Sequence, residues 1–199
     1  MPYPPRVYFE GAVYHVTARG DNREPIFFDD EDRRVYLALL ARYKRHFQFT
    51  LYAYALMPNH VHLVLKPASG TVISRIMQCF TIAYARTFNR RHGRVGHVFQ
   101  GRFHSRLITE DVYLLVVSRY IHLNPVRAKL VRAPGDFVWS SYRAYQDGRS
   151  GDDLTDTELV LGLVSPRSER QRQDYCTFVE MPWRSENQSP EAPTPYQIH

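Results

Sequence analysis

The nine residues MPNHVHLVL, at positions 57–65, are the stretch that most constrains how this chain folds. Successive side chains of a β-strand point to opposite faces, so an extended backbone here turns His60 and His62 to one face and Val61 to the other. The apolar residues that follow without a break predict a buried strand, and the proline and asparagine before it predict a turn. Two imidazoles near the start of one strand are half of a divalent-metal site, although a sheet also tolerates two histidines on its surface.

Composition limits the classes of protein to which the chain can belong. It has 199 residues and 44% hydrophobic side chains, enough for one domain with a buried core and an extension. Its two cysteines, Cys79 and Cys176, form neither a disulfide framework nor a zinc-ribbon motif. No apolar run is long enough to span a bilayer, and the first residues do not resemble a signal peptide. We therefore expect a cytoplasmic protein without a membrane partner.

Basic charge is concentrated in the middle of the chain. The net charge is +6, and residues 70–107 contain seven arginines and no acidic residue. Residues 152–199, by contrast, contain nine acidic residues and four arginines. Aromatic residues alternate with the central arginines, a composition typical of surfaces that follow a nucleic-acid backbone and stack on its bases. The same aromatic residues also fit the core of a helix and a strand, so composition alone leaves their role open.

Hydrophobic periodicity predicts strands and helices over the first 108 residues. The expected strands cover residues 12–18, 48–56, 57–65 and 103–108, and the expected helices cover residues 29–46 and 71–91. The order strand, helix, strand, strand, helix, strand is that of the ferredoxin-like split βαβ fold. We therefore predict an α+β fold with an antiparallel sheet of four to five strands and helices on one face.

A helical extension is expected after the sheet. The pattern predicts a third helix from residue 112 to about residue 124, where Pro125 ends or kinks it. Two short helices are also expected, at residues 155–164 and 168–180. The last residues are rich in proline and poor in apolar side chains, so we expect them to be disordered. The predicted division is a main domain of residues 1–131, a helical extension of residues 132–183 packed on it and a tail of residues 184–199.

The segment SRYIHLNPVRA, residues 118–128, pairs a phenol with an amide. Tyr120 and Asn124 are four residues apart, so in a helix they lie one turn from each other on the same face. A tyrosine that attacks phosphorus needs a cation to neutralise the phosphate, and a metal held by two imidazoles needs an oxygen ligand as well. This helix can supply both groups to the histidine strand. The alternative is that Tyr120 packs in the core and Asn124 caps the helix before the proline.

These motifs together point to a known family. MPNHVHLVL followed by RYIHLNPVRA resembles the REP-associated tyrosine transposases, which belong to the HUH (His-hydrophobic-His) single-tyrosine transposases of single-stranded DNA. YHVTARG, GHVFQGRF and WSSYRAY resemble segments of the same family, and the matches follow the family's order from about residue 8 to residue 180. Each match alone is unspecific, whereas the set is highly specific.

The resemblance implies roles for individual residues. His60 and His62 match the metal-binding histidines, Asn124 matches the third ligand and Tyr120 matches the nucleophile. The implied activity is that of a metal-dependent endonuclease and strand transferase, which nicks and joins hairpin-forming repetitive DNA through a 5′-phosphotyrosine and a free 3′-OH. The implied cofactor is Mg²⁺ or Mn²⁺, and two imidazoles suit Mn²⁺ better. Residues 1–131 would then be the catalytic domain.

Other basic side chains are assigned to DNA contacts or to structural roles. The expected DNA contacts are Arg19, Arg23, Arg102 and Arg106. Structural rather than catalytic roles are expected for His15, His104 and His122. The expected partner is single-stranded or hairpin DNA, and we expect a monomer rather than a dimer.

Two other functions stay open at this point. A domesticated relative that binds hairpin DNA without cutting it would use the same fold, but binding alone does not require the four site residues. A two-histidine phosphoesterase would use an H-x-T motif, and residues 15–17 have that form. Such enzymes need a second copy, and His62 stands where its hydroxyl residue would be.

Overall fold

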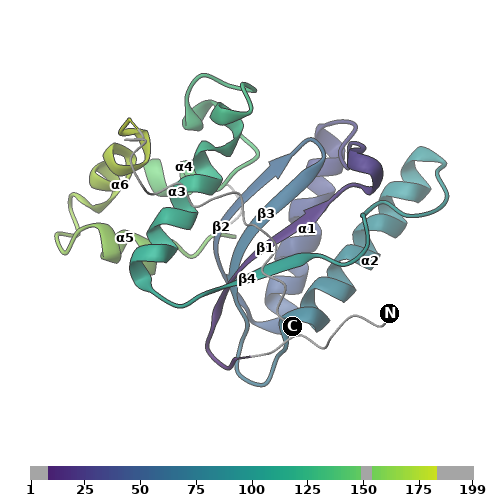
Figure 1. The fold of residues 1–199 in the computed structure, drawn as a ribbon, viewed down its shortest axis with the longest axis horizontal. Coiled ribbons are helices and arrows are strands. Elements are labelled where there is room, and N and C mark those ends of the chain that lie inside the picture. The colour runs from purple at the N-terminus through teal and green to yellow at the C-terminus, as the bar shows by residue number, and fades with distance from the viewer. Residues whose placement is uncertain (1–8, 149–153, 183–199) are drawn as a thin grey trace.

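The computed structural model describes residues 9–148 and 154–182, which form a sheet with helices on both faces (Figure 1). The sheet contains β1 (Val13–Arg19), β2 (Thr50–Met57), β3 (His60–Lys66) and β4 (His104–Ile108) in the order β2-β3-β1-β4, and all neighbouring strands are antiparallel. One helix follows β1 and one follows β3, which is the ferredoxin-like order and confirms the predicted α+β fold. The sheet has four strands, the lower of the two numbers expected.

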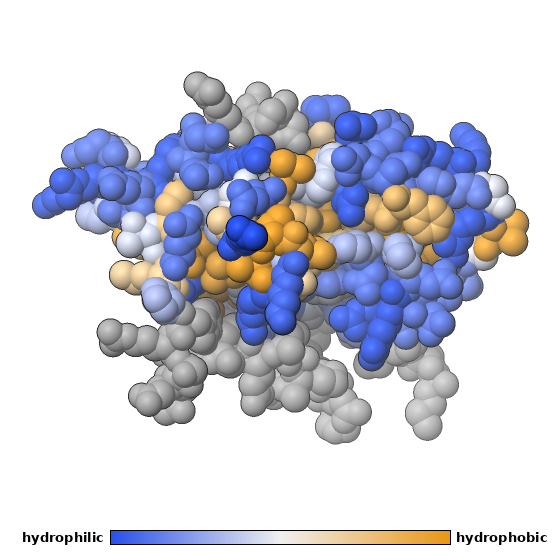
Figure 2. Space-filling model, turned by 90° about the horizontal axis from the view of Figure 1, so that it is seen from above, coloured by the Kyte–Doolittle hydropathy of each residue, from blue (hydrophilic) through white to orange (hydrophobic). Residues whose placement is uncertain are grey.

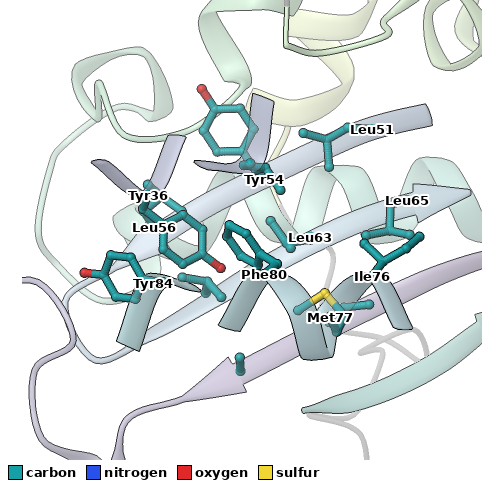
Figure 3. Packing of buried hydrophobic residues seen from close by; sticks show 14 of the residues in the cluster. Tyr36, Leu51, Tyr54, Leu56, Leu63, Leu65, Ile76, Met77, Phe80 and Tyr84 are labelled. Atoms are coloured by element: carbon teal, nitrogen blue, oxygen red, sulfur yellow. The ribbon is translucent and has the colours of Figure 1, made fainter. Parts of the chain in front are cut away.

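Two long helices, α1 (Asp30–Phe47) and α2 (Ile73–His92), lie side by side on one face of the sheet (Figure 1). Figure 3 shows the core on this face, where aromatic side chains of the helices meet leucines of β2 and β3. Tyr36 of α1 and Phe80 of α2 are fully buried there, with ring centroids 4.7 Å apart. Val61 of β3 belongs to the same core, so strand alternation turns the histidines of β3 to the other face.

A side-chain cap begins α1, and a glycine follows the end of α2. Asp29 caps α1 by accepting a hydrogen bond from the backbone N–H of Asp32 at 3.0 Å. α2 is followed by Gly93, whose φ of 61° favours a residue without Cβ. The carboxylate of Asp32 is buried and pairs with Arg91 at 2.5 Å and with His92 at 2.8 Å. This ion-pair group joins the start of α1 to the end of α2.

The third long helix, α3 (Asp111–Arg127), packs on the opposite face of the sheet. β2 presents Ala53 and Ala55 to this face, and their small side chains let α3 approach closely. Val117 and Ile121 of α3 are buried against them. The two helices of the ferredoxin-like unit thus lie on one face, as predicted, while β2 is buried on both faces because α3 covers the second one.

α3 continues through Pro125 and ends at Arg127, three residues beyond the predicted end near residue 124. Proline has no N–H, so it removes the one hydrogen bond that residue 125 would donate to the carbonyl of Ile121. The turn is nevertheless complete, because the N–H of Ala128 donates to the carbonyl of Asn124 at 2.9 Å. A proline in the last turn therefore removes one bond without ending the helix.

The C-terminal part of the described chain is helical, as predicted. α4 (Tyr142–Gln146), α5 (Glu158–Val164) and α6 (Gln171–Glu180) lie on the α3 side of the sheet, away from α1 and α2 (Figure 1). Two 3₁₀ turns, η1 (Asp21–Arg23) and η2 (Pro134–Asp136), lie in the connections. The boundary predicted at residue 131 stays a prediction, and the tail predicted at residues 184–199 lies outside the described residues.

The segment before α4 covers the outer edge of β2. The N–H of Leu56 donates to the carbonyl of Trp139 at 2.9 Å, and the N–H of Ser141 donates to the carbonyl of Tyr54 at 3.0 Å. Without such partners an edge strand presents unpaired backbone groups. Residues 139–141 therefore complete β2 and attach the extension to the sheet.

The face of the molecule seen from above is mostly hydrophilic. Seen from above, apolar side chains gather in a band across the middle, with hydrophilic side chains on both sides (Figure 2). Among the described residues, no helix combines the length and the apolar character needed to cross a bilayer.

A buried hydrogen-bond network fixes α3 against the extension. His122 is fully buried, with Nε2 2.8 Å from Oγ of Ser141 and Nδ1 2.8 Å from the hydroxyl of Tyr175. The Tyr175 hydroxyl in turn donates to Oγ of Ser118 at 3.1 Å. Burial lowers the pKa of His122 to about 3, so the ring is neutral at pH 7 and offers one donor and one acceptor. This network sets the rotation of α3 about its axis.

Replacing His122 by leucine should lower the free energy of unfolding by about 1–3 kcal/mol, because two buried hydroxyl groups lose a partner. Urea unfolding followed by circular dichroism measures the change. The matched control is His97→Leu at an exposed position, which should change stability by less than about 0.5 kcal/mol. A loss for His122→Leu as small as that of the control would contradict the anchoring role.

Candidate active site

The two histidines of β3 lie on one face of the strand, as alternation predicts. The ring centroids of His60 and His62 are 5.0 Å apart. His62 is buried and His60 is partly buried, while Val61 between them has no exposed surface. The pair is therefore held by a rigid central strand rather than by a loop.

α3 brings the phenol and the amide to the same place. Nδ2 of Asn124 lies 3.0 Å from Nε2 of His62. The ring of Tyr120 lies edge-on to that of His62, with centroids 5.7 Å apart, and the tyrosine is only partly buried. The structure thus brings the four predicted site residues together and leaves the phenol outside the sealed core.

Each of the two histidines has one ring nitrogen engaged away from the site. Nδ1 of His60 lies 2.7 Å from Oδ1 of Asn59, an oxygen that only accepts hydrogen bonds. The proton of His60 is therefore held on Nδ1, and the lone pair is on Nε2. In His62 it is Nε2 that faces Asn124, whereas Nδ1 faces β1.

Burial keeps both histidines neutral at pH 7. It lowers the pKa of His60 to about 4, with the charge of Arg19 as a second cause. It also holds the pKa of His62 well below its usual value, with the neighbouring imidazoles and then Arg19 as further causes. A neutral imidazole is the form that binds a metal ion.

This donor set fits a divalent metal ion. Two imidazole nitrogens and the amide oxygen of Asn124 would hold an ion from one side and leave positions for phosphate and water. Among the described residues, no group of three or more His, Cys, Asp or Glu is placed to hold a metal ion, and the amide of Asn124 is the third donor expected in this set. Imidazole ligands suit Mn²⁺ better than Mg²⁺, and the identity of the metal stays a prediction.

The region from the N-terminal strand to Asn124 matches a known family: residues 8–124 fit the family described as transposase IS200 like. The chain belongs to the IS200-like transposase family. A protein of Haemophilus influenzae named as a REP-associated tyrosine transposase is 26% identical over 154 residues, which are 69% of this chain and 83% of that protein. A solved structure of a REP-associated tyrosine transposase bound to a REP hairpin has a TM-score of 0.62 at 21% identity, covering 80% of this chain and 96% of the other. The family confirms the resemblance of the motifs, and the solved structure shows the same fold.

In this IS200-like transposase, a third histidine reaches the site from β1. Nε2 of His15 lies 3.0 Å from Nδ1 of His62, and the two ring planes are inclined by 27° with centroids 5.2 Å apart. The ring of Tyr120 is 6.4 Å from that of His15. Of the other two histidines with expected structural roles, His104 is exposed on β4, on the same face of the sheet but two strands from His62, and His122 belongs to the buried network. His15 therefore contacts a predicted metal ligand, in keeping with the structural role expected for it.

Two of the four arginines predicted to bind DNA lie on the histidine face of the sheet. Arg19 is opposite His60 in the register of β1 and β3, and Arg106 is opposite His15 in the register of β1 and β4. Directly opposed residues of neighbouring strands share a face, so both side chains leave the sheet on the side of the site. Both residues are exposed.

The other two lie at the border of the same region. The carbonyl of Arg23 accepts a hydrogen bond from Nδ2 of Asn59 at 3.1 Å, so its backbone is joined to the residue before the histidines. Arg102 is exposed in the segment before β4. For all four arginines, contact with DNA stays a prediction.

The central arginines are more strongly paired than the composition suggested. Arg91 forms ion pairs with Asp29 and Asp32, at 2.7 and 2.5 Å. Arg94 forms one with Glu24 at 2.8 Å. These three acidic residues lie before residue 70 in the sequence. The charges of Arg91 and Arg94 are therefore paired, although residues 70–107 contain no acidic residue.

Sequence reasoning missed three residues beside the site. Cζ of Arg127 lies 5.4 Å from the ring centroid of Tyr120. The seven-residue spacing of this pair equals two helical turns, which would have pointed to the contact. Asn59 was predicted only as a turn residue. Oγ1 of Thr17 lies 3.3 Å from Nδ1 of His62, and this contact depends on the pairing of β1 with β3, which the sequence does not show.

Alanine at His62 should weaken Mn²⁺ binding by more than about 100-fold, since loss of an outer partner alone costs about 10–100-fold. Isothermal titration of the metal-free protein with Mn²⁺ measures this affinity. Asn124→Ala should weaken binding by a smaller factor, and His104→Ala, on the exposed strand β4, should leave it unchanged. Equal affinities of wild type and His62→Ala would exclude a metal site here.

Proposed function

We propose that the protein is a metal-dependent single-stranded DNA endonuclease and strand transferase that acts through Tyr120. The observation that carries this proposal is the meeting of a phenol and an amide on α3 with two neutral imidazoles on β3. A site with a nucleophile and a metal-binding set on rigid elements suits phosphoryl transfer, in which positioning and charge neutralisation do most of the catalysis.

The proposed substrate is single-stranded DNA next to a hairpin. The support comes from the solved relative with the same fold, which is described as bound to a REP hairpin. The exposed Arg19 and Arg106 add positive charge on the histidine face, where a phosphate backbone would pass. α3 carries Tyr120 to histidines of its own chain, so we propose that one chain forms a complete site.

The reaction that we propose is an exchange of phosphodiester bonds. Oη of Tyr120 forms a bond to phosphorus, the bond from phosphorus to the 3′ oxygen breaks, and the 3′ oxygen leaves with a proton as a free hydroxyl. A bound Mg²⁺ or Mn²⁺ supplies Lewis-acid polarisation of the phosphate. Attack by another 3′-OH on the phosphotyrosine reverses these bond changes and joins two strands without an external energy source.

Arg127 is placed to assist the nucleophile. Its guanidinium group lies over the Tyr120 ring at 5.4 Å, a distance at which a cation interacts with an aromatic face. The same charge stabilises a phenolate more than a phenol and offers paired N–H donors to a phosphate. The proposed role of Arg127 is therefore to hold Tyr120 and the scissile phosphate together.

Tyr120→Phe should abolish the covalent protein–DNA adduct and leave hairpin binding within about threefold, since only the reacting oxygen is removed. The measurement is incubation of labelled single-stranded DNA carrying hairpin repeats with protein and Mn²⁺, followed by denaturing electrophoresis and a separate binding assay. Binding without any adduct in the wild type, across a panel of repeats, would favour the non-cleaving DNA-binding function instead.

Arg127→Gln should lower the rate of adduct formation by about 10- to 1000-fold, the range expected when a charge that stabilises the transition state is removed. Single-turnover kinetics measure this rate. The matched control is Arg34→Gln, an exposed arginine on α1 at the opposite face of the sheet, which should react as the wild type does. An unchanged rate for Arg127→Gln would remove this residue from the proposed site.

A further inference from the structure

We propose that His15 is a positioning residue that holds the proton of His62 on Nδ1, so that the lone pair on Nε2 faces the metal position. The inference rests on the proposed function only because that function uses this lone pair to bind a metal ion. The positions of the protons on the two rings are a property of the folded protein without metal and without DNA.

The contact between the two rings is close and buried. Nε2 of His15 lies 3.0 Å from Nδ1 of His62, within hydrogen-bond distance, and the exposed fractions of the two residues are 7% and 6%. Oγ1 of Thr17 is a second neighbour of the same Nδ1, at 3.3 Å. The antiparallel register of β1 and β3, with Thr17 opposite His62, sets this geometry through the backbone.

A hydrogen bond between two imidazole nitrogens allows only two arrangements. Either Nδ1–H of His62 donates to His15, or Nε2–H of His15 donates to His62. In the second arrangement, neutral His62 carries its proton on Nε2, which points at Asn124 and cannot bind a metal. In the first arrangement the lone pair is on Nε2, which also matches the Nδ2 group of Asn124 at 3.0 Å as a donor.

In His60, the other histidine of the pair, a different partner holds the proton on Nδ1. Nδ1 of His60 is held by Oδ1 of Asn59 at 2.7 Å, which leaves the lone pair of that ring on Nε2. Both rings thus have Nδ1 engaged by a neighbour, which leaves the lone pair of each ring on Nε2. Outer partners of this kind fix the tautomer and the orientation of metal-binding histidines in general.

The experiment uses the full chain with ¹⁵N-labelled histidine, free of metal, at pH 7. Long-range ¹H–¹⁵N spectra report which nitrogen of each ring carries the proton. We expect the proton of His62 on Nδ1 and that of His15 on its own Nδ1. A spectrum with the proton of His62 on Nε2 would overturn the inference, and this readout is independent of DNA cleavage.

Two variants of His15 test the consequence for metal binding. His15→Leu removes the acceptor and should weaken Mn²⁺ affinity, measured by isothermal titration, by about 10–100-fold. His15→Gln places an amide group near the position of Nε2 and should keep the affinity within about threefold of wild type. His104→Leu is the control for loss of an exposed imidazole on the same sheet, and it should bind as wild type does.

Each outcome decides for or against the role of His15. A folded His15→Leu protein with wild-type affinity for Mn²⁺ would overturn it, as would a His15→Gln protein as weak as His15→Leu. If His15→Leu fails to fold, the wild-type tautomer and the His15→Gln affinity still give the answer. If the wild type binds no Mn²⁺, the proposed function is lost, whereas the tautomer of His62 still judges this inference.

Discussion

The rotation of α3 about its own axis is the constraint on which the site depends. Successive residues of an α-helix point about 100° apart, so Tyr120 and Asn124 face the histidines only while Ile121 faces the alanines of β2. His122 points in a third direction, into hydrogen bonds with the C-terminal extension. Neighbouring residues of a single turn therefore serve chemistry, core packing and anchoring, and a helix turned by one residue would lose all three.

The parts of the structure that follow from local periodicity could be predicted from the sequence. Alternation along β3 places His60 and His62 on one face, and helical spacing places Tyr120 and Asn124 on one face of α3. The order of the first six elements gives the ferredoxin-like sheet because short connections leave few ways to pair the strands. The roles of the four residues came from the resemblance to a family and not from spacing.

The parts that depend on contacts between distant segments could not be predicted. β2 is buried on both faces, so its sequence has no alternation to indicate that a helix covers the second face. The register that places His15 beside His62 belongs to the folded sheet, and no local pattern records it. Likewise Glu24, the ion-pair partner of Arg94, lies 70 residues away in the sequence, so counting the charges near Arg94 does not reveal the pair.

The backbone hydrogen bonds between β2 and residues 139–141 make the extension part of the folding unit. A protein cut after α3 would keep all four site residues, yet the outer edge of β2 would lose these partners. Bare edge strands recruit other chains by strand addition, so such a fragment should associate into oligomers or aggregate. The smallest fragment that keeps this edge of β2 covered therefore extends well past Asn124, the last of the four site residues.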